Sequence, residues 1–265
     1  MPSKNLRETL RRGKTLTAYL TLGDPLTSDK TIIEALTASG VDIFELGIPT
    51  TKPKYDGPVI RASHKRALER GVTIDKAFTL IREFTAITGA NTILLTYFSV
   101  ALNYGLQDFM EKASIAGISC VLFPDLLIDY INSLDVYIKL CEKYGVEPAF
   151  FITSCFPHRL ISKLTKIDPA FIYLGLMAST GILLPITTSK TIRIMKGLVG
   201  DTPLLAGFAI STPQQISNCI KAGADGVIIG SALLRLLEME QGENGATKLK
   251  SFILSLKEAL TGWQC

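Results

Sequence analysis

Residues 42–48 read Asp42-Ile43-Phe44-Glu45-Leu46-Gly47-Ile48, a nearly continuous apolar run with one internal carboxylate. Such a run is typical of a strand that is buried on both faces, as the strands of a parallel sheet are. On either side of it apolar residues recur at helical spacing, first at Ile32, Ile33 and Leu36 and then through Val59–Arg70. Seven similar runs bring the number of predicted strands to eight. They are Leu16–Leu22, Thr92–Phe98, Ile118–Phe123, Pro148–Thr153, Phe171–Met177, Leu204–Ile210 and Gly226–Gly230.

Amphipathic stretches separate these runs, and several begin at Ser, Thr or Asp and end at Gly, as helix caps require. The further predicted helices are Ile74–Thr88, Leu106–Ala116, Leu134–Tyr144, Leu160–Ile167, Ser189–Leu198, Pro213–Ala222, Ala232–Glu240 and Lys248–Leu260. The segment Gln241-Gly242-Glu243-Asn244-Gly245 is predicted to be a loop. This alternation predicts one α/β domain over residues 1–265, a single (β/α)8 TIM barrel with an extra N-terminal helix. An open doubly wound sheet would also alternate, but Leu22-Gly23-Asp24-Pro25 is not the glycine-rich dinucleotide turn of such a sheet.

Composition and charge exclude several classes of function. The 265 residues are 47% hydrophobic and 20% charged, and no apolar run reaches the roughly 20 residues that span a membrane. The net charge of +4 is spread along the predicted helices, so no nucleic-acid partner is expected. Five cysteines without a CxxC pair, beside only two histidines, make a Cys/His zinc site unexpected and predict reduced thiols in a cytoplasmic protein.

Two carboxylates are the first candidates for chemistry, because a TIM barrel carries its active site at the carboxyl ends of its strands. Glu45 lies in an otherwise apolar strand, where burying a charge is costly unless it is paired or protonated. It is either a general acid or base with a raised pKa or a structural ion pair at the barrel rim. Asp56, in Tyr55-Asp56-Gly57-Pro58, either caps the next helix or faces the same pocket as Glu45.

The last two predicted strands end in small residues, in Gly207-Phe208-Ala209-Ile210-Ser211 and Gly230-Ser231, and Ser231 opens a helix. Loops after strands seven and eight, together with a helix N-terminus, form the usual phosphate site of this fold. Small residues let backbone N–H groups approach a phosphate, whereas the alternative is that these glycines only make tight turns. Of the remaining polar residues, Asp125 is interpreted as structural and His64 as a surface or packing residue.

Five short motifs keep a characteristic order and spacing: Thr21-Leu22-Gly23-Asp24-Pro25, Glu45-Leu46-Gly47-Ile48-Pro49, Tyr55-Asp56-Gly57-Pro58, Gly207-Phe208-Ala209-Ile210-Ser211 and Ala222-Gly223-Ala224-Asp225-Gly226. With them the chain resembles the tryptophan synthase alpha subunits over essentially its whole length, and most of all their archaeal branch. The resemblance implies a retro-aldol lyase of tryptophan biosynthesis that splits indole-3-glycerol phosphate into indole and glyceraldehyde 3-phosphate. It implies no metal and no organic cofactor, and it implies a hetero-oligomer with a beta subunit.

The resemblance also implies roles for single residues. Glu45 matches the family's acid/base, and Asp56 matches the group that accepts the indole N–H and stabilises the developing indolenine cation. Such proton transfer typically contributes about 10²–10⁴-fold in rate. The implied substrate-binding positions are Tyr19, Tyr97, Leu122, Tyr173, Thr180, Phe208 and Ile228, and the implied phosphate-binding positions are Gly181, Ala209, Gly230 and Ser231. Thr180 matches the loop threonine that positions Asp56.

The chain departs from the family pattern at three places. Thr50-Thr51-Lys52-Pro53 stands where the bacterial pattern is Phe-Ser-Asp-Pro, in a loop that contacts the beta subunit. Ala209 replaces the second glycine of the phosphate segment, so a positive φ there would strain it. Leu176 or Met177 replaces the usual arginine after the sixth strand. A different phosphate-binding barrel, a free-standing lyase and a non-catalytic paralogue therefore stay open as alternatives.

Overall fold

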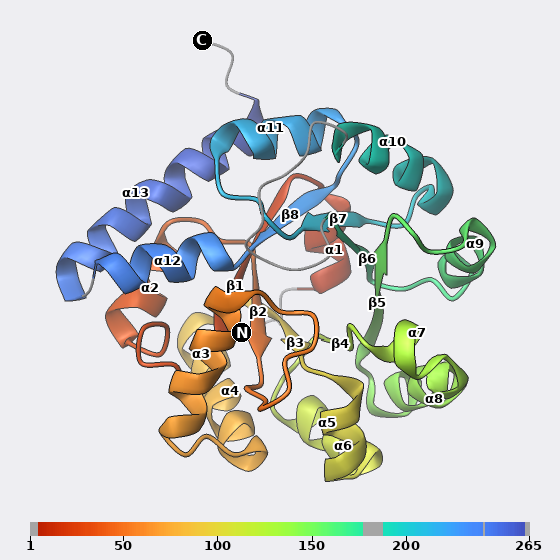
Figure 1. Cartoon of the computed structure of the whole chain (residues 1–265), viewed down its shortest axis with the longest axis horizontal. Helices are drawn as coiled ribbons and strands as arrows, with labels where there is room; N and C mark the ends of the chain where they lie inside the picture. The colour runs from red at the N-terminus through yellow and green to blue at the C-terminus, as the bar shows by residue number, and fades with distance from the viewer. Residues whose placement is uncertain (1–4, 177–187, 241, 263–265) are drawn as a thin grey trace.

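The parallel strands of the chain form a closed barrel in the order β1 to β8, in a computed structural model that describes residues 5–176, 188–240 and 242–262. Each strand pairs with its neighbour in sequence, and β8 pairs with β1 to close the sheet (Figure 1). The strands are β1 (Thr15–Thr21), β2 (Ile43–Gly47), β3 (Asn91–Leu95), β4 (Cys120–Leu122), β5 (Glu147–Thr153), β6 (Phe171–Gly175), β7 (Leu204–Gly207) and β8 (Gly226–Ile229). The predicted (β/α)8 TIM barrel is confirmed.

Helices connect the strands and surround the barrel on its outside (Figure 1). They are α2 (Lys30–Ala38), α3 (Pro58–Glu69), α4 (Ile74–Thr88), α5 (Phe98–Tyr104), α6 (Leu106–Ile115), α7 (Leu126–Asp129), α8 (Leu134–Tyr144), α9 (His158–Thr165), α10 (Thr188–Val199), α11 (Pro213–Lys221), α12 (Ser231–Met239) and α13 (Gly242–Thr261), with a short 3-10 turn η1 (Ile131–Ser133) before α8. Within the described part of the chain, no helix combines the length and the apolarity needed to cross a membrane.

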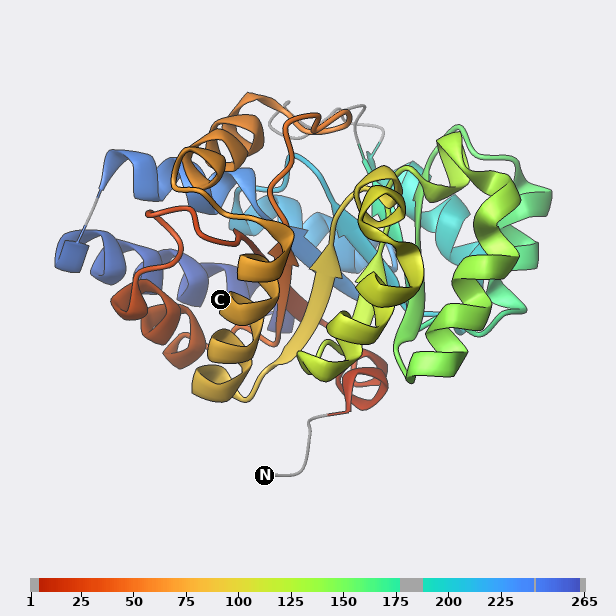
Figure 2. The ribbon, with the colours of Figure 1, turned by 90° about the horizontal axis from the view of Figure 1, so that it is seen from below.

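The extra N-terminal helix, α1 (Leu6–Arg11), closes the amino end of the barrel. Figure 2 shows it below the strands, at the end opposite the long connection from β2 to α3. Leu6 and Leu10 are buried and join the apolar cluster inside the barrel. Arg7 forms an ion pair with Glu147, at the start of β5, through two hydrogen bonds of 2.7 Å. The barrel is therefore sealed at this end, and a substrate has to enter at the other.

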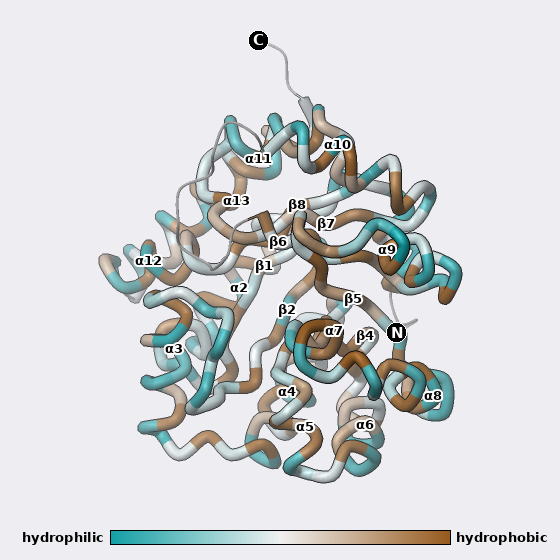
Figure 3. The backbone as a smooth tube through the Cα atoms, turned by 45° about the vertical axis from the view of Figure 1, so that its right-hand side comes forward, coloured by the Kyte–Doolittle hydropathy of each residue, from teal (hydrophilic) through white to brown (hydrophobic). Residues whose placement is uncertain are grey.

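Apolar side chains form two layers, one inside the barrel and one between the strands and the helices. The inner layer contains Ile43, Ile93, Cys120, Leu122, Ala149, Phe151, Phe171, Tyr173, Leu205 and Ile228. The outer layer is larger and receives the apolar faces of the helices. Figure 3 shows the result on α8, whose hydrophilic residues lie on the side away from the barrel. Because both strand faces are buried, the strands are nearly continuous in apolar residues, as their sequence predicted.

Several predicted boundaries were wrong, and two of the strand ends have a clear local cause. The third strand ends at Leu95, because the Asp125 carboxylate accepts the N–H groups of Phe98 and Ser99 at 2.5 and 3.3 Å and so starts α5. The seventh strand ends at Gly207, because Phe208 and Ala209 take φ values of +69° and +61°, outside the β region. The sixth ends at Gly175, and Met177 lies outside the described residues.

The segment predicted as a loop at residues 241–245 is also corrected, since α13 begins at Gly242. Its two glycines have different causes: Gly242 has a φ of +62°, and Gly245 is required by close packing. A side chain at Gly245 would meet the Glu240 carbonyl oxygen at 2.4 Å, so only glycine allows α12 and α13 to join so tightly. Asn244 donates to the Glu240 carboxylate at 2.6 Å and strengthens the junction. Gln241 itself is outside the described residues.

Candidate active site

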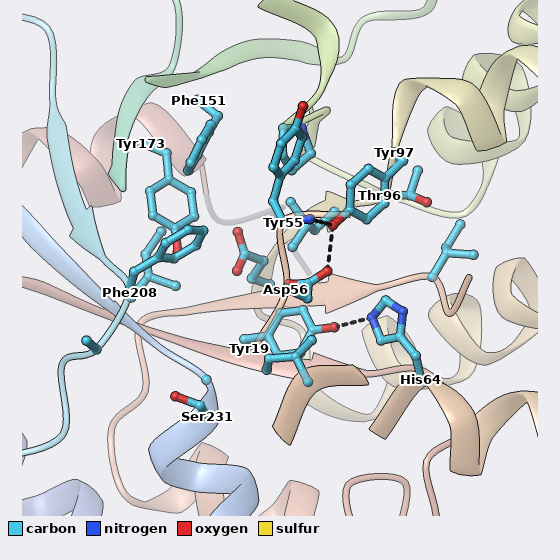
Figure 4. A pocket seen from close by; sticks show the side chains of 18 of the residues that line it. Tyr19, Tyr55, Asp56, His64, Thr96, Tyr97, Phe151, Tyr173, Phe208 and Ser231 are labelled. Carbon is cyan, nitrogen blue, oxygen red and sulfur yellow. Dashed lines mark hydrogen bonds between the residues drawn. The ribbon is translucent and has the colours of Figure 1, made fainter. Parts of the chain in front are cut away.

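A pocket that is partly open to solvent lies at the carboxyl ends of the strands. Its wall is formed by Tyr19, Glu45, Ile48, Tyr55, Asp56, Ile60, His64, Leu95, Thr96, Tyr97, Pro124, Phe151, Tyr173, Phe208, Ala209, Ile210, Ile228, Gly230 and Ser231. Figure 4 shows that the polar side chains Asp56, Tyr97 and His64 lie on one side, and the aromatic rings Phe151, Tyr173 and Phe208 on the other. The pocket thus combines an apolar wall with a few ionisable groups, as small-molecule sites do.

Glu45 is held inside the barrel by the strand ladder. It lies on β2 in register with Tyr19 of β1 and Ile93 of β3, and only 1% of its surface is exposed. Its Oε1 atom has no hydrogen-bond partner among the described residues, and none of their cations pairs with it. Burial and the nearby charge of Asp56 raise the pKa of Glu45 to about 8. At neutral pH its carboxyl group is mostly protonated, so it can donate a proton to a substrate.

Asp56 lies at the end of the β2–α3 loop and does not cap the next helix, because the N-cap residue of α3 is Gly57. Its Oδ2 atom instead accepts a hydrogen bond of 2.8 Å from the Tyr97 hydroxyl. The same hydroxyl accepts the backbone N–H of Tyr55 at 2.8 Å (Figure 4). Burial raises the pKa of Asp56, and the charges and hydrogen bond around it oppose that rise. The carboxylate is thereby aimed into the pocket.

The rest of this loop is attached to other elements by polar contacts. Lys54 donates to both oxygens of Asp129, on α7, at 2.8 and 2.7 Å, and the Tyr55 hydroxyl donates to Asp129 Oδ2 at 2.9 Å. Arg61, one turn into α3, donates to the Asp56 carbonyl oxygen at 2.6 Å. The position of Asp56 therefore depends on side chains that are far from it in the sequence.

The aromatic wall comes from the ends of β5, β6 and β7. Phe151 and Tyr173 lie edge to face with ring centres 5.4 Å apart, and Phe208 lies within 5.8 Å of both rings. The strand ends leave room for such rings by carrying glycine. A side-chain carbon at Gly47 would approach the Tyr19 hydroxyl to 2.4 Å, and one at Gly207 would approach the Tyr173 ring to 2.3 Å. These glycines are required by close approach, not by a turn.

The end of the pocket near β7 and β8 has the features of an anion site. Phe208 and Ala209 both have positive φ, and Ser231 is the first residue of α12. Gly230 has φ −139°, so it is not a tight-turn glycine; a side chain there would crowd Tyr19 at 3.2 Å. A helix N-terminus offers unpaired backbone N–H groups and a partial positive charge to an anion. Ala209 thus has the positive φ that strains an alanine.

Most of the residues predicted from the sequence line this one pocket. Glu45, Asp56 and the predicted contacts Tyr19, Tyr97, Tyr173, Phe208, Ile228, Ala209, Gly230 and Ser231 do so. Leu122 does not: it is fully buried in the inner apolar layer below the pocket wall. Thr180 and Gly181 lie outside the described residues. Asp125 is structural, as interpreted, because it holds the start of α5.

The sequence interpretation missed nine residues of the pocket wall, among which Tyr55, Phe151 and His64 carry an aromatic or ionisable side chain. Tyr55 and Phe151 adjoin residues already singled out, but nothing in their own surroundings marks them. His64 is 4% exposed and lies on the buried face of α3 with Ile60, Ser63 and Ala67. The i, i+3, i+4, i+7 spacing of these four residues was the signal that could have placed His64 inside.

The arrangement can supply a proton from Glu45, accept a hydrogen bond from a substrate N–H at Asp56, and hold a flat apolar ring between Tyr19, Tyr173 and Phe208. Among the described residues, no group of three or more His, Cys, Asp or Glu side chains is placed to hold a metal ion. The chemistry available from these side chains is proton transfer next to an apolar ring and an anion site.

Comparison with known proteins identifies the family. Residues 6–261 match the family model of the tryptophan synthase alpha chain. The tryptophan synthase alpha chain of Saccharolobus solfataricus is 34% identical over 94% of this chain and 99% of its own length, and that of Petrotoga mobilis is 33% identical over 95% and 98%. A solved tryptophan synthase alpha subunit of Pyrococcus furiosus superposes with a TM-score of 0.82 at 27% identity, covering 92% of this chain and 98% of its own. The chain therefore belongs to the tryptophan synthase alpha chain family.

Proposed function

We propose that residues 1–265 act as one catalytic domain that cleaves indole-3-glycerol phosphate into indole and glyceraldehyde 3-phosphate, the reaction of this family. The observation that carries the proposal is the buried carboxyl of Glu45, whose Oε1 has no hydrogen-bond partner among the described residues, in a pocket that Asp56 also faces. A sugar-phosphate isomerase of the same fold needs neither the second carboxylate nor an apolar wall of this size. The departures from the family pattern leave both carboxylates in place.

Glu45 moves both protons of the reaction. Its carboxyl donates a proton to indole C3, which becomes tetrahedral and leaves the ring as an indolenine cation. The resulting carboxylate then removes the proton from the hydroxyl on the adjoining carbon. That carbon becomes the aldehyde as the carbon–carbon bond breaks, and the bonding electrons return to the ring to give indole. Glu45 ends protonated, so the cycle needs no further acid, and a pKa near neutrality suits both transfers.

Asp56 accepts the indole N–H and stabilises the positive charge that the ring carries between the two proton transfers. Its carboxylate is held by the Tyr97 hydroxyl at 2.8 Å, which keeps it oriented before the charge forms. A preorganised group of opposite charge is among the most effective ways to lower such a barrier. The Tyr19, Tyr173 and Phe208 rings provide apolar surface for the indole.

The phosphate is assigned to the backbone at Ala209 and Gly230 and to the N-terminus of α12 at Ser231. Two observations support this assignment. In Figure 4 Ser231 lies on the side of Phe208, away from Tyr97 and His64, and helix N-termini prefer anions. By family resemblance alone, Gly181 is assigned to the same site and Thr180 to the positioning of Asp56. The substrate would then span the pocket, with its ring toward Asp56 and its phosphate toward Ser231.

We further propose that the chain works with a beta subunit, which would take up the indole, and that it is cytoplasmic. A partner is suggested by the family, and the altered residues Thr50-Thr51-Lys52-Pro53 lie on the loop expected to contact it. The free thiols of Cys120, Cys141 and Cys219, all buried, suit a reducing compartment. Gel filtration of the chain with and without a cognate beta subunit tests the association.

The direct test is an assay of indole release from indole-3-glycerol phosphate by the purified chain, with and without a beta subunit. We expect release in both cases, with a loss of about 10²–10⁴-fold in Glu45→Gln and a smaller loss in Asp56→Asn. Absence of release under both conditions would refute the lyase and favour a non-catalytic paralogue. Undiminished release by Glu45→Gln would refute the role of that residue alone.

A further inference from the structure

His64 is a buried ionisable group in the pocket wall that the two proton transfers do not use. It projects from α3 and is 4% exposed. The helix that carries it is fixed by Arg66, which forms a two-armed ion pair of 2.9 and 2.7 Å with the fully buried Asp24. Buried ionisable groups of this kind concentrate at functional sites, so we expect His64 to have a role there.

Both ring nitrogens of His64 have partners. Nδ1 accepts the backbone N–H of Thr50 at 3.2 Å, and Nε2 lies 3.0 Å from the Tyr19 hydroxyl oxygen (Figure 4). Because Nδ1 is an acceptor, the proton of the neutral ring is on Nε2, which donates to Tyr19. The Tyr19 hydroxyl can then donate to Thr21 Oγ1 at 3.1 Å. One chain of hydrogen bonds therefore connects the β2–α3 loop to the pocket wall.

Burial of His64 favours this neutral form. Burial lowers its pKa, and the carboxylates of Asp56 and Asp24 act in the opposite direction. Asp24 is already paired with Arg66. A proton on Nδ1 would also face the Thr50 N–H, donor against donor, and would break the contact with the loop. The hydrogen bond from Thr50 thus selects the tautomer that carries its proton on Nε2.

We propose that His64 is a positioning residue for the cleavage reaction: its neutral ring ties Thr50, at the root of the loop that carries Asp56, to Tyr19 in the pocket wall. The proposal rests on the proposed lyase function. The far end of the loop is already held by Asp129, Tyr97 and Arg61. His64 supplies the anchor at the near end, so that Asp56 meets the indole N–H with both ends of its loop fixed.

Three substitutions separate the two contacts. His64→Asn keeps an acceptor near the position of Nδ1 but is too short to reach Tyr19. His64→Gln can place an amide N–H near the position of Nε2 but loses the acceptor for Thr50. His64→Leu removes both, and His158→Asn, at the exposed start of α9, is the matched control. Loss of the contact with Thr50 should lower kcat, because that contact positions Asp56, which stabilises charge in the transition state. Loss of the contact with Tyr19 should instead change KM.

We expect kcat to fall about 5- to 10-fold in His64→Leu and His64→Gln, the worth of a net hydrogen bond, and to stay within about 2-fold in His64→Asn. His158→Asn should match the parent. Equal kcat values in Asn and Gln variants that melt at the same temperature would overturn the positioning role. Full activity of His64→Leu would also overturn it. Failure of the parent chain to release indole would instead count against the proposed function.

Nitrogen-15 NMR of the imidazole rings tests the tautomer without any assay of activity. The chain has two histidines, so the spectrum of His64→Asn identifies the signals of His64 by their loss. We expect a protonated Nε2 and an unprotonated Nδ1 at pH 7. A proton on Nδ1, or a ring that exchanges freely between tautomers, would contradict the contact with Thr50 and with it the proposal.

Discussion

Glu45 and Asp56 face the same pocket but are held by different kinds of structure. Glu45 belongs to a strand whose backbone is paired on both sides, with β1 and β3. Asp56 belongs to a loop whose position depends on hydrogen bonds with Arg61 of α3, Tyr97 at the N-cap of α5 and Asp129 of α7. The first carboxylate is fixed by the fold itself, and the second by a few side-chain contacts.

The strand that holds Glu45 and the loop that holds Asp56 should respond differently to mutation. A strand buried inside a barrel cannot move to solvate Glu45, so its pKa stays near 8 and the carboxyl stays unpaired. The loop at Asp56 can shift at the cost of one or two hydrogen bonds, each worth about 1 kcal/mol. Mutations at Glu45 should therefore affect chemistry and stability in opposite directions, whereas mutations around Asp56 should affect both in the same direction.

The largest effect is expected from Glu45→Gln, which should lower kcat by about 10²–10⁴-fold while leaving the fold at least as stable. The folded pKa of Glu45, about 8, is above its ordinary value of 4.5, so the folded chain holds a proton that the unfolded chain releases. The contribution of Glu45 to stability is thus complete below about pH 4.5 and is lost as pH rises to about 8.

Urea unfolding at pH 5, 7 and 9 measures this. The free energy of unfolding of the parent should decline relative to Glu45→Gln as pH rises through this range. Glu147→Gln is the matched control, since Glu147 is also a strand glutamate but pairs with Arg7 at the closed end of the barrel. A parent and a Glu45→Gln variant with parallel pH curves would contradict the raised pKa.

The next effect concerns Tyr97→Phe, which removes the hydroxyl between Tyr55 and Asp56. A buried N–H and a carboxylate each lose a partner, at a cost of about 1–3 kcal/mol in all. We expect kcat/KM to fall by about 10- to 100-fold and stability to fall with it. Tyr104→Phe, on the same helix, is the control, because its hydroxyl contacts Asp75 at the surface. If Tyr97→Phe loses no more than that control, the loop is not held through this hydroxyl.

The same contrast explains how much the sequence could predict. Glu45 was placed in the pocket from its own surroundings, because a single carboxylate in an otherwise apolar strand requires a reason, whereas Tyr19 and Tyr173 were placed there by the family resemblance. The loop contacts could not be predicted: nothing near Lys54 or Tyr55 indicates that their partner is Asp129. The position of Leu122 was wrong for a related reason, since depth along a barrel strand depends on the stagger between strands.

A smaller effect is expected at Ala209, which is strained where the family has glycine. An alanine at φ +61° costs about 1 kcal/mol, so Ala209→Gly should raise the free energy of unfolding by that order. It should also leave the backbone of the phosphate site in place, so that KM is unchanged or lower. The control is Ala206→Gly, on β7 with ordinary strand geometry, which should destabilise the chain. Destabilisation by both variants would show that Ala209 is not strained.

The smallest effect is expected at the outer attachment of the loop, where Lys54 meets Asp129. Lys54 is exposed, and exposed ion pairs contribute little to stability because solvent and salt screen them. Lys54→Met should therefore lower kcat by less than about 3-fold at low salt and by even less in 0.5 M NaCl. Asp129→Asn should cost more than Lys54→Met, because Asp129 also accepts the Tyr55 hydroxyl, a contact that salt does not screen.

The control for this comparison is Lys65→Met, which breaks an exposed pair with Glu69 on the outer side of α3. It matches Lys54→Met in charge and exposure but does not contact the loop. If Asp129→Asn and Lys54→Met lose equal activity and recover it equally in salt, the attachment is purely ionic, and Tyr55 does not contribute. If Asp129→Asn keeps a loss in high salt that Lys65→Met lacks, then Asp56 is positioned by short hydrogen bonds, in contrast to Glu45, which is positioned by the sheet.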